Sequence, residues 1–296
     1  MNDQELLDRV ENIKVWQQYD VRAPHKPLLL LYALGRVQSG MDRLVAYSEV
    51  EPMLQDLLEQ FGPPRKSYHP DQPFKRLPRD KLWELEYPME LVGRPSDSLK
   101  PAEMRNLEVS GGFPREIHDY LATRTELVHT LATKLLSENF PVTYHDEIRR
   151  ILGLDARKEV STTKKHARDP LFRENVLRAY GRECCVCGSN LRLDNALFDL
   201  EAAHIMWHSH GGPDQIQNGL ALCGFHHKAF DRGAWGLSDS DYAIQVSSEL
   251  NGSSRAMDLL LNFEGENLQL PRKSSHYPNT EFVRWHRKEV FRNEVS

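Results

Sequence analysis

Two short pairs of metal-binding residue types constrain the fold of this 296-residue chain more than any other feature. Cys184 and Cys187 are separated by two residues, and Cys223 and His226 repeat that spacing downstream. Two close pairs of soft or borderline ligands are what a tetrahedral structural zinc site requires. The sequence therefore predicts a domain that folds around Zn2+, with Cys185 as a spare thiol. The alternative is a group of small buried thiols.

The same stretch carries residues for a second, catalytic site. Residues 198–205 are expected to form a strand with His204 near its end, and the pair Asn218-Gly219 turns the chain toward a helix. On that helix, His227 and Asp231 are four residues apart, so both side chains lie on one face and can hold one cation. His204 can face them from the strand. This pattern indicates a single metal-dependent site.

The order of strand, loop, strand and helix, with its His, Asn and helical His, resembles the HNH (ββα-metal) nucleases. The stretch FDLEAAHIMWH…QNGLALCGFHHKAFDRG is similar to their McrA-like restriction branch, and the likeness extends over residues 169–291. It implies that His204 is the general base, that the carbonyl of Asn218 orients the base, and that His227 and Asp231 bind one divalent ion, which can be Mg2+, Mn2+ or another divalent metal.

One position departs from that family pattern. Many HNH nucleases carry Asp or His immediately before the base, and this chain has Ala203 there. Either Glu201, on the same face of the strand as Ala203, reaches the catalytic ion, or water fills the position. The blander interpretation is that His204 and His227 are core histidines with satisfied hydrogen bonds.

The first half of the chain predicts a separate α+β domain that is rich in helix. A uniformly apolar helix is expected to open at Pro27, and a basic, proline-rich stretch follows at residues 65–86. Residues 155–168 lack apolar periodicity and are expected to form a flexible basic linker. We therefore predict a recognition domain at residues 1–154 and a nuclease domain at residues 169–296.

The segments RAPHKPLLLLYALGR and PFKRLPRDKLWELE, with an SGGF loop, resemble the sulfur-binding domain of McrA-like enzymes that cut phosphorothioated DNA. The likeness spans residues 6–152. The sulfur atom is larger than oxygen and is a poorer hydrogen-bond acceptor. An apolar concavity would therefore bind sulfur in preference to a phosphate oxygen. The expected wall residues are Ala23, Pro24, Pro73 and Phe74; the expected backbone contacts are Arg22, His25, Lys26, Arg76 and Arg79; Ser110, Gly111 and Gly112 are expected near base edges.

Composition limits the remaining possibilities. The formal net charge of −5 argues against a nonspecific, charge-driven nucleic-acid coat. The longest apolar run is too short to span a bilayer, and the polar, acidic start does not resemble a signal peptide, so a cytoplasmic location with reduced cysteines is expected.

The sequence thus predicts a Type IV restriction endonuclease that recognises phosphorothioated double-stranded DNA, acting as a homodimer at least transiently. Two alternatives stay open. One is an HNH endonuclease that depends on methylated bases. The other is a catalytically inactive, zinc-containing DNA-binding protein, which the alanine at position 203 makes conceivable.

Overall fold

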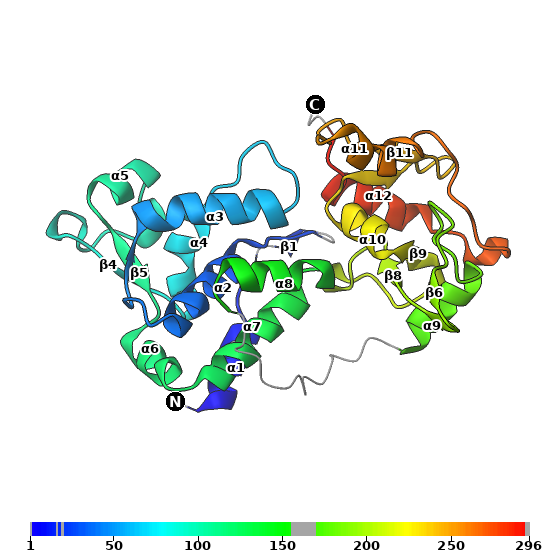
Figure 1. Cartoon of the computed structure of the whole chain (residues 1–296). Helices are drawn as coiled ribbons and strands as arrows, with labels where there is room; N and C mark the ends of the chain where they lie inside the picture. The colour runs from blue at the N-terminus through cyan, green and yellow to red at the C-terminus, as the bar shows by residue number, and fades with distance from the viewer. Residues whose placement is uncertain (1, 16, 19–20, 155–169, 294–296) are drawn as a thin grey trace. The chain divides into compact units, whose positions relative to one another are not determined.

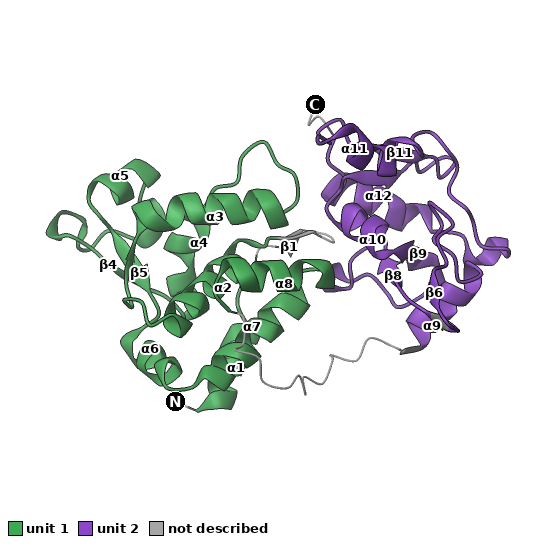
Figure 2. Cartoon of the chain, in the orientation of Figure 1, with its two compact units in different colours: residues 1–160 green, residues 161–296 purple. Residues whose placement is uncertain are grey.

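The computed structural model describes residues 2–15, 17–18, 21–154 and 170–293. The chain divides into two compact units, Met1–Val160 and Ser161–Ser296 (Figure 2). The linker predicted at residues 155–168 lies outside the described residues.

The first unit is mostly helical (Figure 1). Its helices are α1 (Asp3–Glu11), α2 (His25–Gln38), α3 (Tyr47–Phe61), α4 (Asp71–Arg76), α5 (Pro101–Asn106), α6 (Arg115–Ala122), α7 (Thr125–Asn139) and α8 (Val142–Ile151), with the 3-10 helix η1 (Leu77–Asp80) after α4. Its strands are the hairpin β1 (Gln17–Gln18) and β2 (Val21–Arg22), and an antiparallel sheet in the order β3 (Val45–Ala46), β5 (Ser110–Gly112), β4 (Glu84–Glu86).

Helix α2 forms the centre of the first core. Its residues Leu28–Leu31 are all at most 1% exposed, which confirms the prediction of a buried helix. It packs against α3, α4 and α7. The helix begins at His25, so Pro27 lies in the first turn, where its missing amide hydrogen costs no helical bond.

The segment from Ser110 to Gly112, predicted as a polar loop, is instead the central strand of the small sheet. A Cβ atom on Gly112 would lie 2.0 Å from the carbonyl oxygen of Arg43, and one on Gly111 would lie 2.5 Å from Trp83 Nε1. Glycine is therefore needed for close packing here, and both glycines are buried.

The second unit contains the predicted ββα arrangement. Its elements are α9 (Pro170–Ala179), β6 (Arg192–Leu193), β7 (Ala196–Leu197), β8 (Leu200–His204), β9 (Gly219–Cys223), α10 (Gly224–Asp231), β10 (Trp235–Leu237), β11 (Ile244–Val246), α11 (Ser254–Leu261) and α12 (Thr280–Glu289). Strands β8 and β9 are antiparallel and pair from Leu200 with Cys223 to His204 with Gly219. The predicted α+β class is confirmed.

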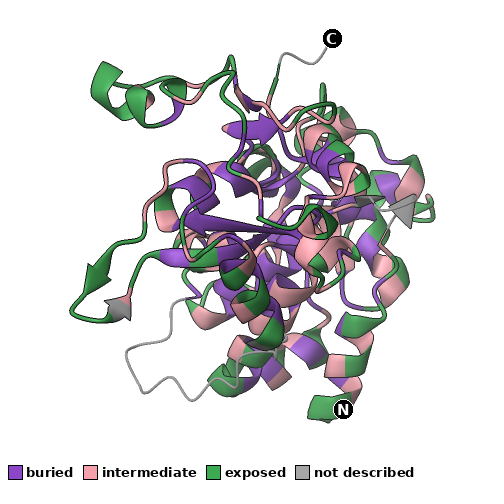
Figure 3. Cartoon of the chain, turned by 90° about the vertical axis from the view of Figure 1, so that its right-hand side faces the viewer, coloured by how far each residue is buried: buried purple, intermediate pink, exposed green. Residues whose placement is uncertain are grey.

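The burial of β9 explains its apolar sequence. Strand β9 is buried along its whole length, because α9 and α10 both pack on it. A continuous apolar run is typical of such a covered strand. Figure 3 shows the buried residues of the chain in purple. Among the described residues, no helix combines the length and apolar character needed to cross a membrane.

Candidate metal centre and active site

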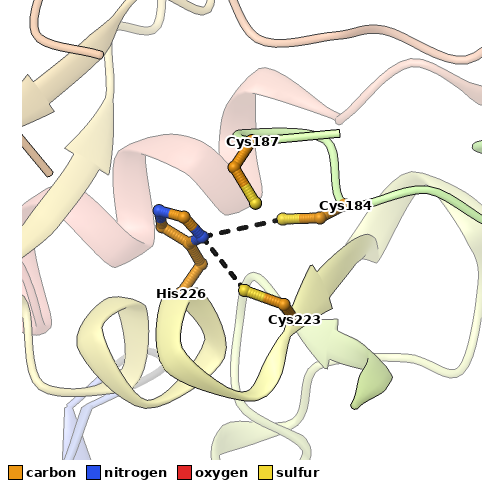
Figure 4. A group of neighbouring side chains, drawn as sticks. All are labelled: Cys184, Cys187, Cys223 and His226. Carbon is orange, nitrogen blue, oxygen red and sulfur yellow. Dashed lines mark hydrogen bonds between the residues drawn. The ribbon is translucent and has the colours of Figure 1, made fainter. Parts of the chain in front are cut away.

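The four predicted zinc ligands converge in the second unit (Figure 4). Cys184 and Cys187 lie in the loop after α9, Cys223 ends β9, and His226 lies in the first turn of α10. Nδ1 of His226 is 3.1 Å from the sulfur of Cys223 and 3.7 Å from that of Cys184. Among the described residues, this is the one group of three or more His, Cys, Asp or Glu side chains whose ligand atoms all lie within 4.8 Å of one another.

The hydrogen bonding of this cluster fits a zinc ion. His226 Nε2 donates to the backbone oxygen of Leu259 at 3.1 Å, so in the neutral ring the lone pair of Nδ1 points toward the sulfurs. Burial lowers the pKa of His226, but hydrogen bonds with Cys184 and Cys187 outweigh it and raise that pKa to about 9. Hydrogen bonds from Cys187 and Cys223 lower the pKa of the Cys184 thiol. The cluster thus attracts positive charge.

Cys185 stands apart from this cluster, as expected. It is 1% exposed, and its backbone amide donates to the carbonyl of Ala221 at 2.8 Å. Burial raises the pKa of its thiol, which therefore stays protonated.

The predicted base, His204, is the last residue of β8 and is 7% exposed. Its ring stacks on Phe172 of α9, with centroids 4.1 Å apart and planes 18° apart. Its Nε2 atom lies 2.7 Å from Oδ1 of Asp214. The imidazole is therefore held by one aromatic face and one carboxylate.

Asp214 was not identified from the sequence. It follows the glycines and proline of the loop after β8, and the only available signal was an acidic residue in a Gly-Gly-Pro-Asp turn. Such turns commonly carry Asp for local reasons, so the contact with His204 could not be inferred from the turn itself.

Asn218 is fully buried and acts on the loop backbone. Its Oδ1 accepts from the amide of Met206 at 2.8 Å, and its Nδ2 donates to the carbonyls of Met206 and Pro213, both at 3.0 Å. Its own carbonyl accepts from the amide of Ile205 at 2.9 Å. These bonds hold the backbone after His204 and the backbone before Asp214, so Asn218 influences His204 through the loop.

The three predicted ligands of the catalytic ion lie together, with Glu201 and Asp231 on either side of the His227 ring. Glu201 Oε2 is 2.5 Å from Nδ1 of this ring, and Asp231 Oδ2 is 3.4 Å from its Nε2. The carboxylates thus lie at opposite nitrogens, whereas a histidine presents one nitrogen to an ion. His227 and Asp231 are buried, and the side chain of Glu201 is 53% exposed.

Side chains on the two faces of β8 contact different helices. Successive strand residues alternate between faces, so Glu201 and His204 project on opposite sides. Glu201 contacts His227 of α10, and His204 contacts Phe172 of α9. Ala203, on the same face as Glu201, is fully buried and supplies no ligand atom.

The predicted sulfur-pocket residues of the first unit occupy two different environments. Pro24 is buried and precedes α2, with Ala23 partly buried before it and His25 opening the helix. Pro73 and Phe74 lie in α4, and Phe74 is fully buried, 5.1 Å from the ring of Tyr47 and 5.7 Å from that of Trp83. Phe74 is therefore packed in the core, and its assignment to the wall of the sulfur pocket stays a prediction.

The residues predicted to contact the DNA backbone also differ from one another in their environments. Lys26 bonds Asp80 at 2.5 Å and the carbonyl of Lys14 at 2.8 Å, and Arg79 pairs with Asp97. Arg76 is exposed. The side chain of Arg22 lies outside the described residues.

A loop that follows α3 approaches His25. Burial lowers the pKa of His25 to about 4, against the opposing effect of a hydrogen bond to the backbone of Tyr68; His69 and Arg65 lower it further. The ring is therefore neutral at pH 7. Tyr68 lies in the basic, proline-rich stretch at residues 65–86, and its position beside His25 could not be predicted because these residues are far apart in the chain.

Comparison with known proteins agrees with both resemblances. The family model of the ScoMcrA-like DNA sulfur-binding domain matches residues 3–157, and that of an HNH endonuclease matches residues 184–238. No curated protein shows a significant match.

Several solved structures are similar to parts of the chain. The sulfur-binding domain of SprMcrA complexed with phosphorothioated DNA is 24% identical, with a TM-score of 0.45 over 52% of this chain and 95% of that chain. The corresponding ScoMcrA complex is 22% identical, with a TM-score of 0.41 over 50% and 94%. The modification-dependent TagI restriction endonuclease is 26% identical, with a TM-score of 0.33 over 43% and 40%.

The ββα element, the Cys3His cluster and the HNH match define the second unit as a metal-dependent endonuclease domain. The sulfur-binding match covers more than half of the chain, so the chain belongs to the ScoMcrA-like DNA sulfur-binding domain family. Both resemblances inferred from the sequence are confirmed.

Proposed function

We propose that this chain is a Type IV restriction endonuclease that binds phosphorothioated double-stranded DNA through its first unit and hydrolyses phosphodiester bonds through its second. The observation that carries the proposal is the presence in one chain of a DNA sulfur-binding domain and an HNH domain. The first would supply the dependence on modification, and the second would supply the chemistry.

The environment of His25 supports recognition of sulfur. Among the described residues, its buried Nδ1 has no hydrogen-bond partner, and the ring is neutral at pH 7. Pro24 and Ala23 lie beside it in the chain. A weakly hydrated surface of this kind accepts polarisable sulfur at less cost than a well-hydrated phosphate oxygen. We retain Ala23, Pro24 and His25 as pocket residues, with the exposed Arg76 and Arg79 contacting the DNA backbone.

In the second unit, His204 would take a proton from the water that attacks phosphorus. An imidazole suits this step because its ordinary pKa lies near physiological pH. As the last residue of β8, it lies at the end of the two-stranded sheet, beside the loop that carries Asp214. Asn218 would hold the surrounding loop rigid.

Nε2 of His227 and the carboxylate of Asp231 would hold a divalent ion such as Mg2+ or Mn2+. When bound, that ion supplies positive charge that stabilises the negative charge of the transition state. Glu201 hydrogen-bonds Nδ1 of His227, so it would keep Nε2 directed toward the ion. We therefore favour Glu201 as an orienting carboxylate over a direct ligand.

The Cys3His cluster would hold a structural Zn2+ that fixes the first turn of α10. Because Cys223 and His226 flank the start of this helix, loss of the ion would also displace the catalytic residues that follow.

Cutting both DNA strands requires two active sites or two successive nicks, so we further propose a dimer at least transiently.

Cleavage of plasmid DNA with Mn2+ or Mg2+ tests the proposal. The expected result is cutting of phosphorothioated plasmid, sparing of unmodified plasmid, and loss of cutting in the His204→Ala variant. Equal cutting of both plasmids would remove the dependence on sulfur. Cutting of methylated DNA alone would favour the modified-base alternative, and no metal-dependent cutting of any substrate would favour the inactive DNA-binding protein.

A further inference from the structure

We propose that Asp214 is a positioning residue for the base His204 and selects Nδ1 as the nitrogen that accepts the proton from water. This inference rests on the proposed nuclease function. The carrying observation is the 2.7 Å contact between Asp214 Oδ1 and His204 Nε2, in a site where the two side chains are 22% and 7% exposed.

The chemistry of the two groups determines the direction of this hydrogen bond. An ionised carboxylate only accepts, so Nε2 of His204 carries the hydrogen. In the neutral ring, the lone pair is then on Nδ1. Contact with Asp214 thus fixes a tautomer that two equivalent water contacts would leave undetermined.

The reaction step can be written in full. A proton passes from water to Nδ1 of His204, the water oxygen bonds to phosphorus, and the bond from phosphorus to the 3′ oxygen breaks. The leaving oxygen takes a proton from solvent, and His204 later returns its own proton to solvent. Asp214 stays ionised throughout and stabilises the imidazolium that forms in the step.

The loop that carries Asp214 is tightly held. Asn218 Nδ2 donates to the carbonyl of Pro213, the residue immediately before Asp214. The amide of Gly212 donates to the carbonyl of Trp207 at 3.1 Å, and a Cβ atom on Gly212 would lie 1.9 Å from the carbonyl oxygen of Met206. Asn218 therefore supports the base in two ways, by bonding the backbone after His204 and the backbone before Asp214.

The aromatic contact completes the arrangement. Phe172 covers one face of the imidazole and limits rotation of the ring out of its plane. Together the stack and the carboxylate restrain both the plane and the tautomer of His204. Pre-organisation of this kind is what a general base requires to meet an attacking water in the correct orientation.

Three full-length variants test this role. Asp214→Ala removes the acceptor, and Asp214→Asn can still accept through Oδ1 but has no charge. Asp194→Asn is the matched control, because Asp194 lies in the exposed turn between β6 and β7 with a φ of 50°, a conformation that Asn tolerates. Single-turnover cleavage, DNA affinity and melting temperature would be measured for each.

We expect Asp214→Ala to lower the single-turnover rate by about 100-fold, within the contribution of a general base. Asp214→Asn should fall between it and the parent, while the control variant should match the parent. DNA affinity should change less than twofold in all three. Cleavage by Asp214→Ala within twofold of the parent would overturn the proposal.

A second readout is independent of cleavage. Two-bond proton–nitrogen spectra of 15N-histidine protein, with His204 assigned from the His204→Gln variant, should show hydrogen on Nε2 in the parent and a mixture of tautomers in Asp214→Ala. Hydrogen on Nδ1 in the neutral parent ring, or an unchanged tautomer in the variant, would overturn the proposal. If the parent cleaves no substrate, the nuclease function fails, and this spectrum still decides the role of Asp214.

Discussion

His226 and His227 are consecutive residues of α10 whose rings belong to different sites. Nδ1 of His226 lies 3.1 Å from the sulfur of Cys223, and Nδ1 of His227 lies 2.5 Å from Oε2 of Glu201. Consecutive helical residues are rotated by about 100° from each other, so one helix can present neighbours to two centres. The Cys3His cluster and the group around His227 are thus joined through a single peptide bond.

Alanine substitutions of these two histidines should have different effects on zinc content, stability and cleavage. His226→Ala removes a zinc ligand, so it should lower both the zinc content and the melting temperature. His227→Ala should keep one zinc per chain and the parent melting temperature within a few degrees, but lose cleavage by about 100-fold or more. Elemental analysis and thermal unfolding check this. Loss of zinc from the His227 variant would show that the sites are not distinct.

The carboxylates around His227 should also differ in their effects. Asp231→Asn should abolish detectable binding of Mn2+ at the catalytic site, because it removes a ligand. Glu201→Gln should weaken that binding by about 10- to 100-fold, as expected for a group that orients a ligand. Titration of Mn2+ followed by electron paramagnetic resonance measures both. Equal loss in the two variants would instead make Glu201 a direct ligand.

Two residues of α4, Phe74 and Arg76, should differ in whether their substitution affects stability or DNA binding. Phe74 is fully buried among aromatic rings, so Phe74→Ala should lower the free energy of unfolding by about 3–5 kcal/mol. The exposed Arg76 should tolerate alanine with little change in stability but with weaker DNA binding. Urea unfolding and a DNA-binding assay test the pair. A stable Phe74→Ala protein that only loses sulfur preference would instead show that Phe74 forms part of the pocket wall.

Acid should destabilise the second unit partly through His286. This ring is 1% exposed and stacks on Phe230 with centroids 3.7 Å apart, and burial lowers its pKa to about 3, despite a hydrogen bond to the carbonyl of Phe230. The unfolded chain, with the ordinary pKa of 6.5, binds this proton more readily. The stability from this group is therefore complete above pH 6.5 and decreases as the pH falls toward 3.

The His286→Gln variant isolates this effect. Between pH 7 and pH 5, the parent should lose about 2 kcal/mol more unfolding free energy than the variant. Urea unfolding of both proteins at the two pH values measures the difference, and protonation of the zinc ligands cancels because both chains contain them. Parallel losses in the two proteins would show that His286 does not titrate as described.

Local spacing allowed much of the second unit to be predicted. The two ligand pairs, the strand ending at His204 and the helical interval between His227 and Asp231 depend on near neighbours in the chain. Periodicity and ligand spacing report such relationships directly. The four cysteine and histidine residues accordingly converge in a cluster that is compatible with zinc, and strand β9 leads directly into α10 after pairing with β8.

Contacts between distant segments account for what was missed. The strand Ser110–Gly112 is three residues long, has little side-chain pattern, and pairs with Val45 and Glu84, which are remote in sequence. Phe74 lies in a proline-rich stretch that resembles a surface loop, yet tertiary packing makes it a core residue. Asp214 contacts His204 only because its loop folds back toward the end of β8.

We propose that sulfur in the DNA backbone determines which DNA this protein cuts. The most direct measurement compares single-turnover cleavage of two synthetic duplexes that differ only in one sulfur atom, using the full-length protein with Mn2+. We expect tighter binding and faster cutting of the sulfur-containing duplex, with cutting abolished by His204→Ala. Equal rates on the two duplexes, or undiminished cutting by the His204 variant, would contradict the proposal.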